Sequence, residues 1–463
     1  MKTTAPLFEI EDRVVARPLR RVAPIAVEAS EDNVTGVAGI ALVGELLDRL
    51  GLVEVADRHH LRPIGPGGYS GGACYRPIVE LQLAGGDFLA DVSLLEDEAT
   101  RRLRGSHALP SHTTLFRFLA GADLGRVMRA QAVNRDLLRR AWAMGAAPAP
   151  GRLTIDPDAT YIDTYGKLKE GSRFSYKGEV QMSPLVGVVG ETGDVLAIRA
   201  RGGNASPRRK LASFIDECVA AIPAEARPLY ELWIRIDSAG FSNKVVETCV
   251  AHKAIFTITA EQNAPLREAI CALAMAPETS WTPAQDVDGE LSGSEVAETT
   301  YAFSGRDLRL VVRRQRKAAG EQLSFDDLGG WRFFACITNA PTSIEAAQID
   351  HHHRLRGAAE EAIRQLKSDF AMNHAPVQNF FGNWVWWLAS ALSHNVARWL
   401  RSLALPEAFA TCRGKRLRTS FLNVAAKVVR RGRKLLLRLP AAYRYADAFV
   451  AALARLRELP RFA

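Results

Sequence analysis

The sequence predicts a mixed α/β fold, in which a sheet flanked by helices follows a helical region and precedes a basic C-terminal region. Three observations predict it. Apolar residues follow helical spacing up to about residue 146, short apolar runs alternate with helical segments over 151–261, and strand-like runs fill 262–343. The composition, with 48% hydrophobic and 24% charged residues, excludes a wholly disordered chain. The length of 463 residues is enough for several domains.

Residues 1–146 are predicted to be mostly helical after an extended, basic lead-in at 13–27. Apolar residues recur at helical spacing from Ile40 to Leu50, and Gly51 ends that segment. Ser111 precedes a short amphipathic run that ends at Gly121, and this run resembles the second half of a helix-turn-helix. Many helical pairs that touch no DNA share the pattern. A DNA-binding or dimerisation domain and a purely structural one therefore both stay open.

An Ala/Pro/Gly linker at 143–151 separates this region from the predicted sheet. Strands are expected over 152–165, 179–190 and 195–203, and a turn joins the last two into a hairpin. A helix opened by Ser206 and Pro207, a strand at 229–237, a helix at 241–252 and a strand at 254–261 follow. This order indicates a mixed sheet over 151–261 with helices on its faces.

Residues 262–343 are predicted to form a small antiparallel β insertion, after which the sheet region resumes over 344–405. One long helix is expected over 344–370, followed by a helix rich in tryptophan. The uninterrupted apolar part of that helix, Trp384 to Leu392, is far shorter than the about 20 residues that span a bilayer. We therefore expect a buried core helix and no membrane partner.

Three carboxylates stand at positions where an α/β sheet can bring them together. Asp158 lies on the first predicted strand, Asp237 at the end of a later strand, and Glu360 on the long helix. Clustered carboxylates repel one another, and a hard cation such as Mg²⁺ removes that repulsion. Two such ions can activate an attacking oxygen and stabilise the leaving oxygen of a phosphodiester. Any one of these acids taken alone is more simply explained as solvated or capping.

The segment around Glu360 strengthens this interpretation. Arg356, Glu360 and Lys367 fall on one helical face, at steps of four and seven residues. An acid between two cations can hold a metal while the cations bind phosphates. The alternative is a solvent-facing ladder of salt bridges.

The order of strand acid, strand acid, β insertion and helix acid, with R-x3-E-x6-K, resembles the bacterial insertion-sequence transposases of the DDE type. Their signature is Y-x2-R-x3-E-x6-K. The runs DATYID, YKG at 176–178, IDSAGFS and NWVWWLASALSHNVARWL resemble the branch usually called insertion sequence thirteen-eighty. His353 stands where the signature has Tyr. Asp156 lies on the same side of the strand as Asp158, so either can be the first ligand, and the D-x-T pattern favours Asp158.

The resemblance implies a ribonuclease-H-like core in which Asp158, Asp237 and Glu360 bind two Mg²⁺ ions, for which Mn²⁺ can substitute. It implies Mg²⁺-dependent cleavage at the ends of an insertion sequence and strand transfer into target DNA. DNA contacts are implied for Arg356, Lys367, His353 and Lys177, and stacking on an extruded base for Trp281 or Trp331. Trp331 begins a strand and is better explained as core, so Trp281 is the stronger candidate.

The implied partners are double-stranded DNA, as terminal inverted repeats and as target, and a second copy of the chain. No P-loop or G-x-G-x-x-G motif is present, so no nucleotide cofactor is expected. Six scattered cysteines without a C-x-x-C pair favour a reducing cytoplasm, and the resemblance suggests a bacterial, nucleoid-associated protein. The alternatives are a metal-dependent nuclease of the same fold and a non-catalytic DNA-binding protein.

The net charge of +9 is concentrated near the C-terminus. Residues 408–446 carry eleven Lys or Arg and no Asp or Glu, so the region 406–463 is predicted to bind the DNA backbone. A solvated basic face is the alternative. The candidate DNA-binding cations of this tract are Arg413, Lys415, Arg416, Arg418, Arg430, Arg431, Arg433 and Lys434.

Overall fold

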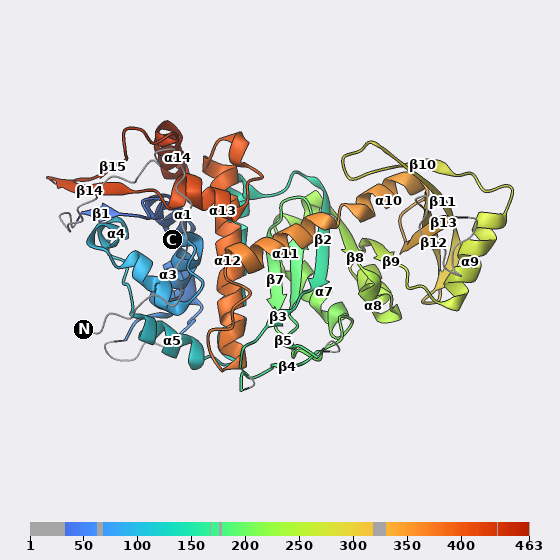
Figure 1. Cartoon of the computed structure of the whole chain (residues 1–463), viewed down its shortest axis with the longest axis horizontal. Coiled ribbons are helices and arrows are strands. Elements are labelled where there is room, and N and C mark those ends of the chain that lie inside the picture. The colour runs from blue at the N-terminus through green and yellow to red at the C-terminus, as the bar shows by residue number, and fades with distance from the viewer. Residues whose placement is uncertain are drawn as a thin grey trace, which may run out of the picture. The chain divides into compact units, whose positions relative to one another are not determined.

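The computed structural model describes residues 33–62, 68–166, 168–175, 178–317, 330–432 and 434–462. The predicted lead-in at 13–27 lies outside these residues. Those from Asn33 onward form one compact unit. Helices and strands alternate around a large central sheet, which confirms the mixed α/β class (Figure 1).

The first part of the unit is helical, as predicted. Helix α1 buries the residues that the helical spacing marks, and Gly51 ends it in the left-handed conformation, with φ of 68°. The apolar faces of these helices form one core. The helices are α1 (Ile40–Leu50), α2 (Leu52–Arg58), α3 (Gly71–Ala84), α4 (Glu98–Leu103), α5 (His112–Ala120) and α6 (Leu124–Ala141).

The central sheet has the strand order β10-β11-β12-β13-β9-β8-β2-β6-β7 within the described residues. Strands β2, β8 and β9 are parallel, and β6 and β7 form the predicted antiparallel hairpin. Helix α7 (Leu211–Ala221) follows Ser206 and Pro207, as predicted, and α8 is Asn243–Ala251. The strands are β2 (Gly151–Ala159), β6 (Leu185–Val189), β7 (Val195–Arg199), β8 (Tyr230–Ile236) and β9 (Ile255–Thr259).

The strands of the β insertion are antiparallel, and they are not separate from the central sheet. Strand β13 pairs with β9, with Ile337 opposite Ile258, so the insertion strands extend the central sheet. Spacing along the chain marks each strand and does not say which free sheet edge the strand will join. The insertion contains α9 (Ala264–Met275), β10 (Thr282–Gln285), β11 (Leu291–Phe303), β12 (Arg306–Arg316) and β13 (Trp331–Thr338).

Two smaller sheets complete the strands of the described residues. One follows β2 and has the order β3-β5-β4, and the other has the order β1-β14-β15. The first comprises β3 (Ile162–Asp163), β4 (Arg173–Phe174) and β5 (Val180–Met182). The second comprises β1 (Val34–Thr35), β14 (Ala426–Arg431) and β15 (Lys434–Arg438).

The long helix predicted over 344–370 is in fact two helices, α10 (Ala346–Arg354) and α11 (Gly357–Asp369). The break falls at Leu355 and Arg356, directly before Gly357, and glycine is a poor helix former. Because the break precedes Gly357, Arg356 stands at the N-cap of α11, one turn before Glu360. At this position Arg356 can contact the candidate site described below.

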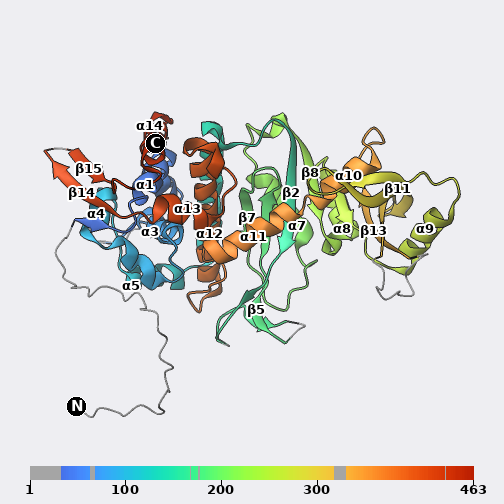
Figure 2. The same cartoon turned by 45° about the horizontal axis from the view of Figure 1, so that its top comes forward.

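Helix α12 (Phe380–Ala404) is the predicted buried core helix. It packs against α3 and α6 on one side and the edge strand β7 on the other (Figures 1 and 2). The Asn395 side chain bonds both the N–H and the C=O of Val195, and the Trp384 indole donates to the carbonyl of Ile198. These hydrogen bonds give partners to backbone groups of the edge strand β7, which has no neighbouring strand on that side among the described residues. No helix in the described part of the chain is both long and apolar enough to cross a membrane.

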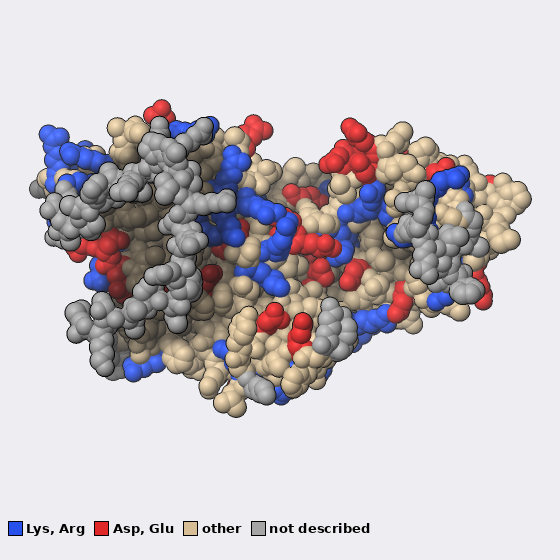
Figure 3. All heavy atoms as spheres, in the orientation of Figure 1, with Lys and Arg blue, Asp and Glu red and all other residues tan. Residues whose placement is uncertain are grey.

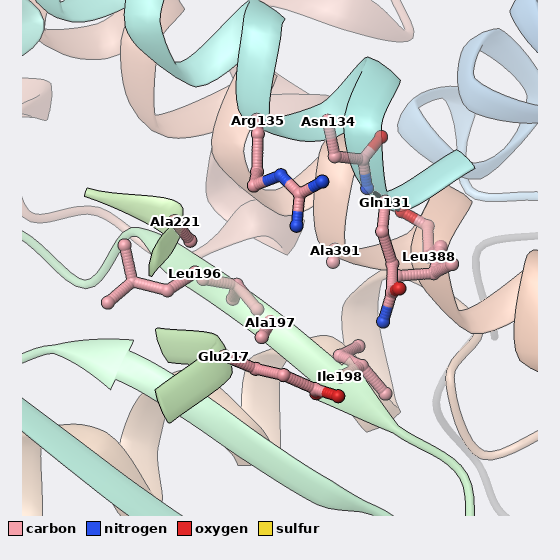
Figure 4. Close-up of a pocket in the computed structure, with 11 residues that line it drawn as sticks. Gln131, Asn134, Arg135, Leu196, Ala197, Ile198, Glu217, Ala221, Leu388 and Ala391 are labelled. Atoms are coloured by element: carbon pink, nitrogen blue, oxygen red, sulfur yellow. Dashed lines mark hydrogen bonds between the residues drawn. The ribbon is translucent and has the colours of Figure 1, made fainter. Parts of the chain in front are cut away.

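Asp194, directly before β7, joins the helical region to the sheet. Its buried carboxylate accepts hydrogen bonds from the indoles of Trp142 and Trp399, and from the guanidinium of Arg398. A small hollow lies nearby, between α6, β7, α7 and α12 (Figure 4). Its lining includes Arg135 and Glu217 and none of the three candidate acids.

Candidate active site

Parallel pairing of β2 with β8 places the first two candidate acids side by side. Ile155 pairs with Ile234, and three residues further along each strand stand Asp158 and Asp237. Asp158 ends β2 and Asp237 directly follows β8, where its carboxylate accepts a hydrogen bond of 3.0 Å from the N–H of Ala239. Both side chains are therefore at the carboxyl end of the parallel strands, where ligands of α/β sheets bind.

Arg356 connects the strand acids to the helix acid. Its Nη1 lies 3.1 Å from Oδ2 of Asp158, and its Nη2 lies 2.7 Å from Oε1 of Glu360. The predicted i, i+4 salt bridge is thus present, but it does not simply face solvent. The same guanidinium reaches across to β2 and holds α11 against the sheet end.

The pKa of Asp158 reflects the closeness of the other two acids. Burial raises the pKa of Asp158 to about 6, Arg356 opposes the shift, and the carboxylates of Asp237 and Glu360 add to it. The side chain of Asp158 is only 18% exposed, whereas that of Glu360 is 57% exposed. The structure therefore brings the three acids within electrostatic range of one another, with Arg356 between two of them.

Asp156 has a different environment, although it lies two residues from Asp158. Its buried carboxylate receives two hydrogen bonds from Arg235, of 2.7 and 2.6 Å. Arg235 also donates to the carbonyl of His352 on α10. This buried ion pair leaves Asp158, rather than Asp156, as the acid of β2 that shares Arg356 with Glu360.

Two further residues of the signature segment are held by their neighbours. The ammonium of Lys367 donates to the carbonyl of Tyr161, and burial lowers its pKa while Asp163 opposes the shift. The ring nitrogens of His353 lie 2.9 Å from the Thr259 hydroxyl and 2.8 Å from the Thr257 hydroxyl. Burial lowers the pKa of His353 to about 3, so this ring is neutral at pH 7. The DNA contacts of both residues stay predictions.

Trp281 lies beside a cation rather than in open solvent. The Arg314 guanidinium is 4.0 Å from the centre of the Trp281 ring and 4.5 Å from that of Trp331. Glu295 receives a hydrogen bond of 2.6 Å from the same guanidinium. Arg314 therefore fills the space between the two indoles, and the stacking of Trp281 on an extruded base stays a prediction.

The basic tract divides into two exposed groups and one buried residue. Arg413, Lys415 and Arg416 are exposed around the start of α13 (Gly414–Leu417), which packs beside α11. Arg413 lies 2.9 Å from Glu361, the neighbour of Glu360. In Figure 3, Lys and Arg side chains gather over α13 and α11, directly beside the acidic side chains near the end of β2.

The second exposed group lies on the β14–β15 hairpin and contains Arg430, Arg431 and Lys434. Arg418 is only 8% exposed, and its guanidinium donates to the carbonyl of Asp369. That position supports the α11–α13 contact and does not offer the guanidinium to a DNA surface. Lys177 and Arg433 lie outside the described residues.

Oxygen donors of the three acids suit a hard divalent cation. Burial raises the pKa of Asp158, although Arg356 opposes the shift. Within the ranges that the structure describes, no three His, Cys, Asp or Glu side chains are close enough together to hold a metal ion. The Arg356 guanidinium lies between Asp158 and Glu360 and pairs with both of them. The donor atoms suit a metal, but the three carboxylates lie too far apart in this structure to bind one ion together.

Residues 18–461 match the family described as "Transposase DDE domain group 1". The chain belongs to this family of DDE transposases. No match was found among curated proteins. Among solved structures, the chain is similar to a piggyBac transposase in a cryo-EM structure of its synaptic complex with hairpin DNA. The two are 9% identical, the match covers 91% of this chain and 82% of that chain, and the TM-score is 0.40.

Three features of this transposase were not predicted from its sequence. They are the Asp156–Arg235 ion pair, the reach of Arg356 to Asp158, and the Arg314 guanidinium beside Trp281. One of them had a signal in the sequence. Once β2 and β8 are paired in parallel, Asp156 and Arg235 stand one step beyond Ile155 and Ile234, so their pairing follows from the register.

Proposed function

We propose that this transposase cleaves DNA at the ends of a bacterial insertion sequence and joins those ends to target DNA. Asp158, Asp237 and Glu360 are its metal-binding acids, in a ribonuclease-H-like core. The observation that carries the proposal is the meeting of Asp158 and Asp237 at the ends of parallel strands, with Arg356 linking Asp158 to Glu360. The parallel strands β2, β8 and β9 beside the antiparallel β6–β7 hairpin support the core assignment.

The acids are proposed to hold two Mg²⁺ ions, with Mn²⁺ as a substitute. Bound there, the ions would polarise the phosphodiester and stabilise the charge of the attacking and leaving oxygens. The protein's own residues orient the reaction. Asp237 is fixed by the N–H of Ala239, and Arg356, once released from the acids, is placed to bind a phosphate beside them.

The exposed cations next to α11 supply the proposed path for DNA. Arg413, Lys415 and Arg416 are exposed around the start of α13, which packs against α11. Lys and Arg side chains gather over this part of the surface (Figure 3). Phosphates held there by charge would position the strand for in-line attack at the acids. Two ends must be held together for joining, so we propose a homodimer on DNA. No nucleotide cofactor takes part in the proposed reaction.

Finer assignments remain part of this proposal. They are membership of the insertion sequence thirteen-eighty branch, a bacterial cytoplasmic location with nucleoid association, and domain boundaries at 1–146, 151–261, 262–343, 344–405 and 406–463. Lys367, His353, Lys177 and Trp281 are proposed to contact DNA.

A plasmid assay tests the proposal. Supercoiled plasmid carrying the DNA that flanks this gene is incubated with the protein and Mg²⁺. Joined products support a transposase, cuts alone indicate a nuclease of the same fold, and a gel shift without cuts indicates a DNA-binding protein. Asp237→Ala is expected to keep DNA binding and lose cleavage. Cleavage by this variant at the wild-type rate would overturn the assignment of the acids.

Asp216→Ala is the matched control, because Asp216 is an exposed acid of α7 paired with His252, outside the cluster. Its cleavage rate is expected to equal that of the wild type. A loss in both variants would instead indicate a general effect of removing an acid.

A further inference from the structure

Arg201 is a buried cation that holds a turn at one end of the central sheet. The residue is only 6% exposed. Its guanidinium donates to the carbonyls of Ser206, Pro207 and Arg209, at 3.0, 3.1 and 2.8 Å, in the turn between β7 and α7. It also donates to the carbonyl and the hydroxyl of Ser183, which lies between β5 and β6. One buried side chain therefore fixes the shape of this turn.

The charge of Arg201 is not balanced by an acid. In the described structure, every hydrogen-bond acceptor of its guanidinium is a carbonyl or hydroxyl oxygen, whereas a buried arginine is usually paired with a carboxylate. Burial lowers the pKa of Arg201 to about 10, and the charges of Arg199 and Arg209 lower it further, while Tyr161 opposes the shift. Arg199 itself pairs with Glu217. A bound anion would supply the negative charge that the turn lacks.

The turn also carries exposed cations. Residues 195–215 contain five Lys or Arg and no Asp or Glu. Arg208 pairs with Glu261 at 2.6 Å. The next two residues, Arg209 and Lys210, are exposed, and no Asp or Glu of the described chain pairs with either. Exposed cations on a turn of fixed shape suit the phosphates of a polyanion.

Strand register places the turn at the level of the candidate acids. Leu185 of β6 pairs with Ala159 of β2 on one side and with Arg199 of β7 on the other. The turn that follows Arg199 therefore begins at the end of the sheet where Asp158 stands, one residue before Ala159.

The turn is attached on both sides of the two strands that lead to the acids. The strand order β9-β8-β2-β6-β7 puts β8 and β2 between β9 and β7. Arg201 fixes the turn near the end of β7, and Glu261, two residues beyond β9, holds Arg208. Because β2, β8 and β9 are parallel, their carboxyl ends lie at one edge. The turn thus lies at the edge of the sheet that carries Asp158 and Asp237.

The turn approaches this edge from the face of the sheet opposite α11. Successive side chains of a strand point to opposite faces. Asp158 faces α11, because it pairs with Arg356. Its neighbour Pro157 pairs with Gly187, which packs against Cys218 of α7. Helix α7 begins directly after the turn. The cations of the turn and those around α13, which packs against α11, therefore lie on opposite sides of the acids.

We propose that Arg209 and Lys210 bind a backbone phosphate of the DNA strand that lies at the acids, with Arg201 as the positioning residue of their turn. The strand is held from both faces of the sheet, by the cations around α13 on one side and by this turn on the other. The inference rests on the proposed function in that the bound strand reaches the acids.

A matched pair of lysines tests the site. Lys210 and Lys253 are both exposed and both have a positive φ, of 67° and 55°, but Lys253 precedes β9 and lies at the opposite end of the sheet. Binding of the full chain to a short duplex from the gene's flanking DNA is measured in EDTA, so that no cleavage occurs. Lys210→Gln is expected to weaken binding about tenfold at about 0.1 M salt and to reduce the slope of log K against log salt by about 0.9. Lys253→Gln is expected to leave both unchanged. Equal losses in the two variants, or no loss in Lys210→Gln, would overturn the proposal.

Neutral phosphates locate the contact on the DNA. A methylphosphonate removes the charge of a single phosphate, and it is placed at successive positions of one strand. The wild type is expected to bind several-fold more weakly when the phosphate held by the turn is neutral, and Arg209→Gln is expected to show no loss at that position. Lys415→Gln, on α13, is expected to become insensitive at a different phosphate. Insensitivity of both variants at the same phosphate, or unchanged sensitivity in Arg209→Gln, would contradict a grip from two sides.

Thermal unfolding of the free protein separates binding from folding. Arg209→Gln keeps the backbone carbonyl that Arg201 bonds and removes a charge that repels Arg201, so its Tm is expected to equal or exceed that of the wild type. A fall in its Tm would show a structural role for the side chain and overturn the proposal. These readouts do not involve cleavage, so they succeed or fail independently of the Asp237→Ala test.

Discussion

Nη1 of Arg356 lies 3.1 Å from Oδ2 of Asp158, across 198 residues of sequence. The same guanidinium lies 2.7 Å from Glu360. A single permanent cation therefore stands between two acids that would otherwise repel each other. The same position is where a divalent ion would need to approach both acids, so Arg356 and a metal compete for it.

Removing this cation is expected to favour the metal. Arg356→Ala should bind Mn²⁺ several-fold more tightly than the wild type in the absence of DNA, because the competing guanidinium is gone, while cleavage falls. Titration followed by electron paramagnetic resonance measures the affinity. Arg364→Ala is the control, because Arg364 is an exposed cation of the same helix that pairs with Glu361. Weaker Mn²⁺ binding by Arg356→Ala than by the wild type would contradict the competition.

Ionisation of Asp158 should lower the stability of the metal-free protein. Its pKa is about 6 in the folded state against 3.8 for an ordinary Asp, so the folded state binds more protons between these values. Stability is therefore expected to fall as pH rises from about 4 to about 6, and to stay lower above that. Asp158→Asn should remove this loss, which is at most about 3 kcal/mol at pH 7, less the lost pairing with Arg356.

Urea unfolding in EDTA at pH 4 and pH 7 measures the effect of Asp158→Asn. The free energy of unfolding of the variant should rise relative to that of the wild type between the two pH values. A wild-type protein whose stability rises over this interval, with no gain for the variant, would show that burial does not dominate at Asp158.

Replacing Asp156 is expected to destabilise the protein, in contrast to replacing Asp158. Asp156→Asn leaves the buried Arg235 without its charge partner, which typically costs about 3–5 kcal/mol. The free energy of unfolding should fall by that order at pH 7, with or without Mg²⁺. A variant that keeps wild-type stability and loses only metal binding would instead identify Asp156 as the first metal ligand.

The roles of Trp281 and Trp331 can be separated with a DNA end that lacks one base. Stacking of a base on an aromatic side chain is worth about 1–3 kcal/mol. If Trp281 stacks on an extruded base, Trp281→Ala should lose about that much binding free energy on intact ends and almost none on ends where that base is absent. Trp331→Ala, on the other side of Arg314, serves as control and should lose equally on both DNAs.

Local structure was largely predictable from the residues. The spacing of apolar residues predicted α1 and its end at Gly51, and the alternation of strands and helices predicted β2, β6, β7, β8 and β9. The steps of four residues between Arg356 and Glu360 predicted their ion pair. These features depend on neighbours within about one turn or one strand, whose contacts are set by backbone periodicity.

Tertiary structure decided everything that joins distant segments. The pairing of β13 with β9, the break that places Arg356 at the start of α11, and the burial of Arg418 could not be read from spacing. Asp156 and Asp158 illustrate the reason. The two acids look alike in sequence, and only the register with β8 gives one of them Arg235 and leaves the other beside Asp237. Composition and periodicity record whether a residue is buried, whereas its partner is set by which strands and helices meet.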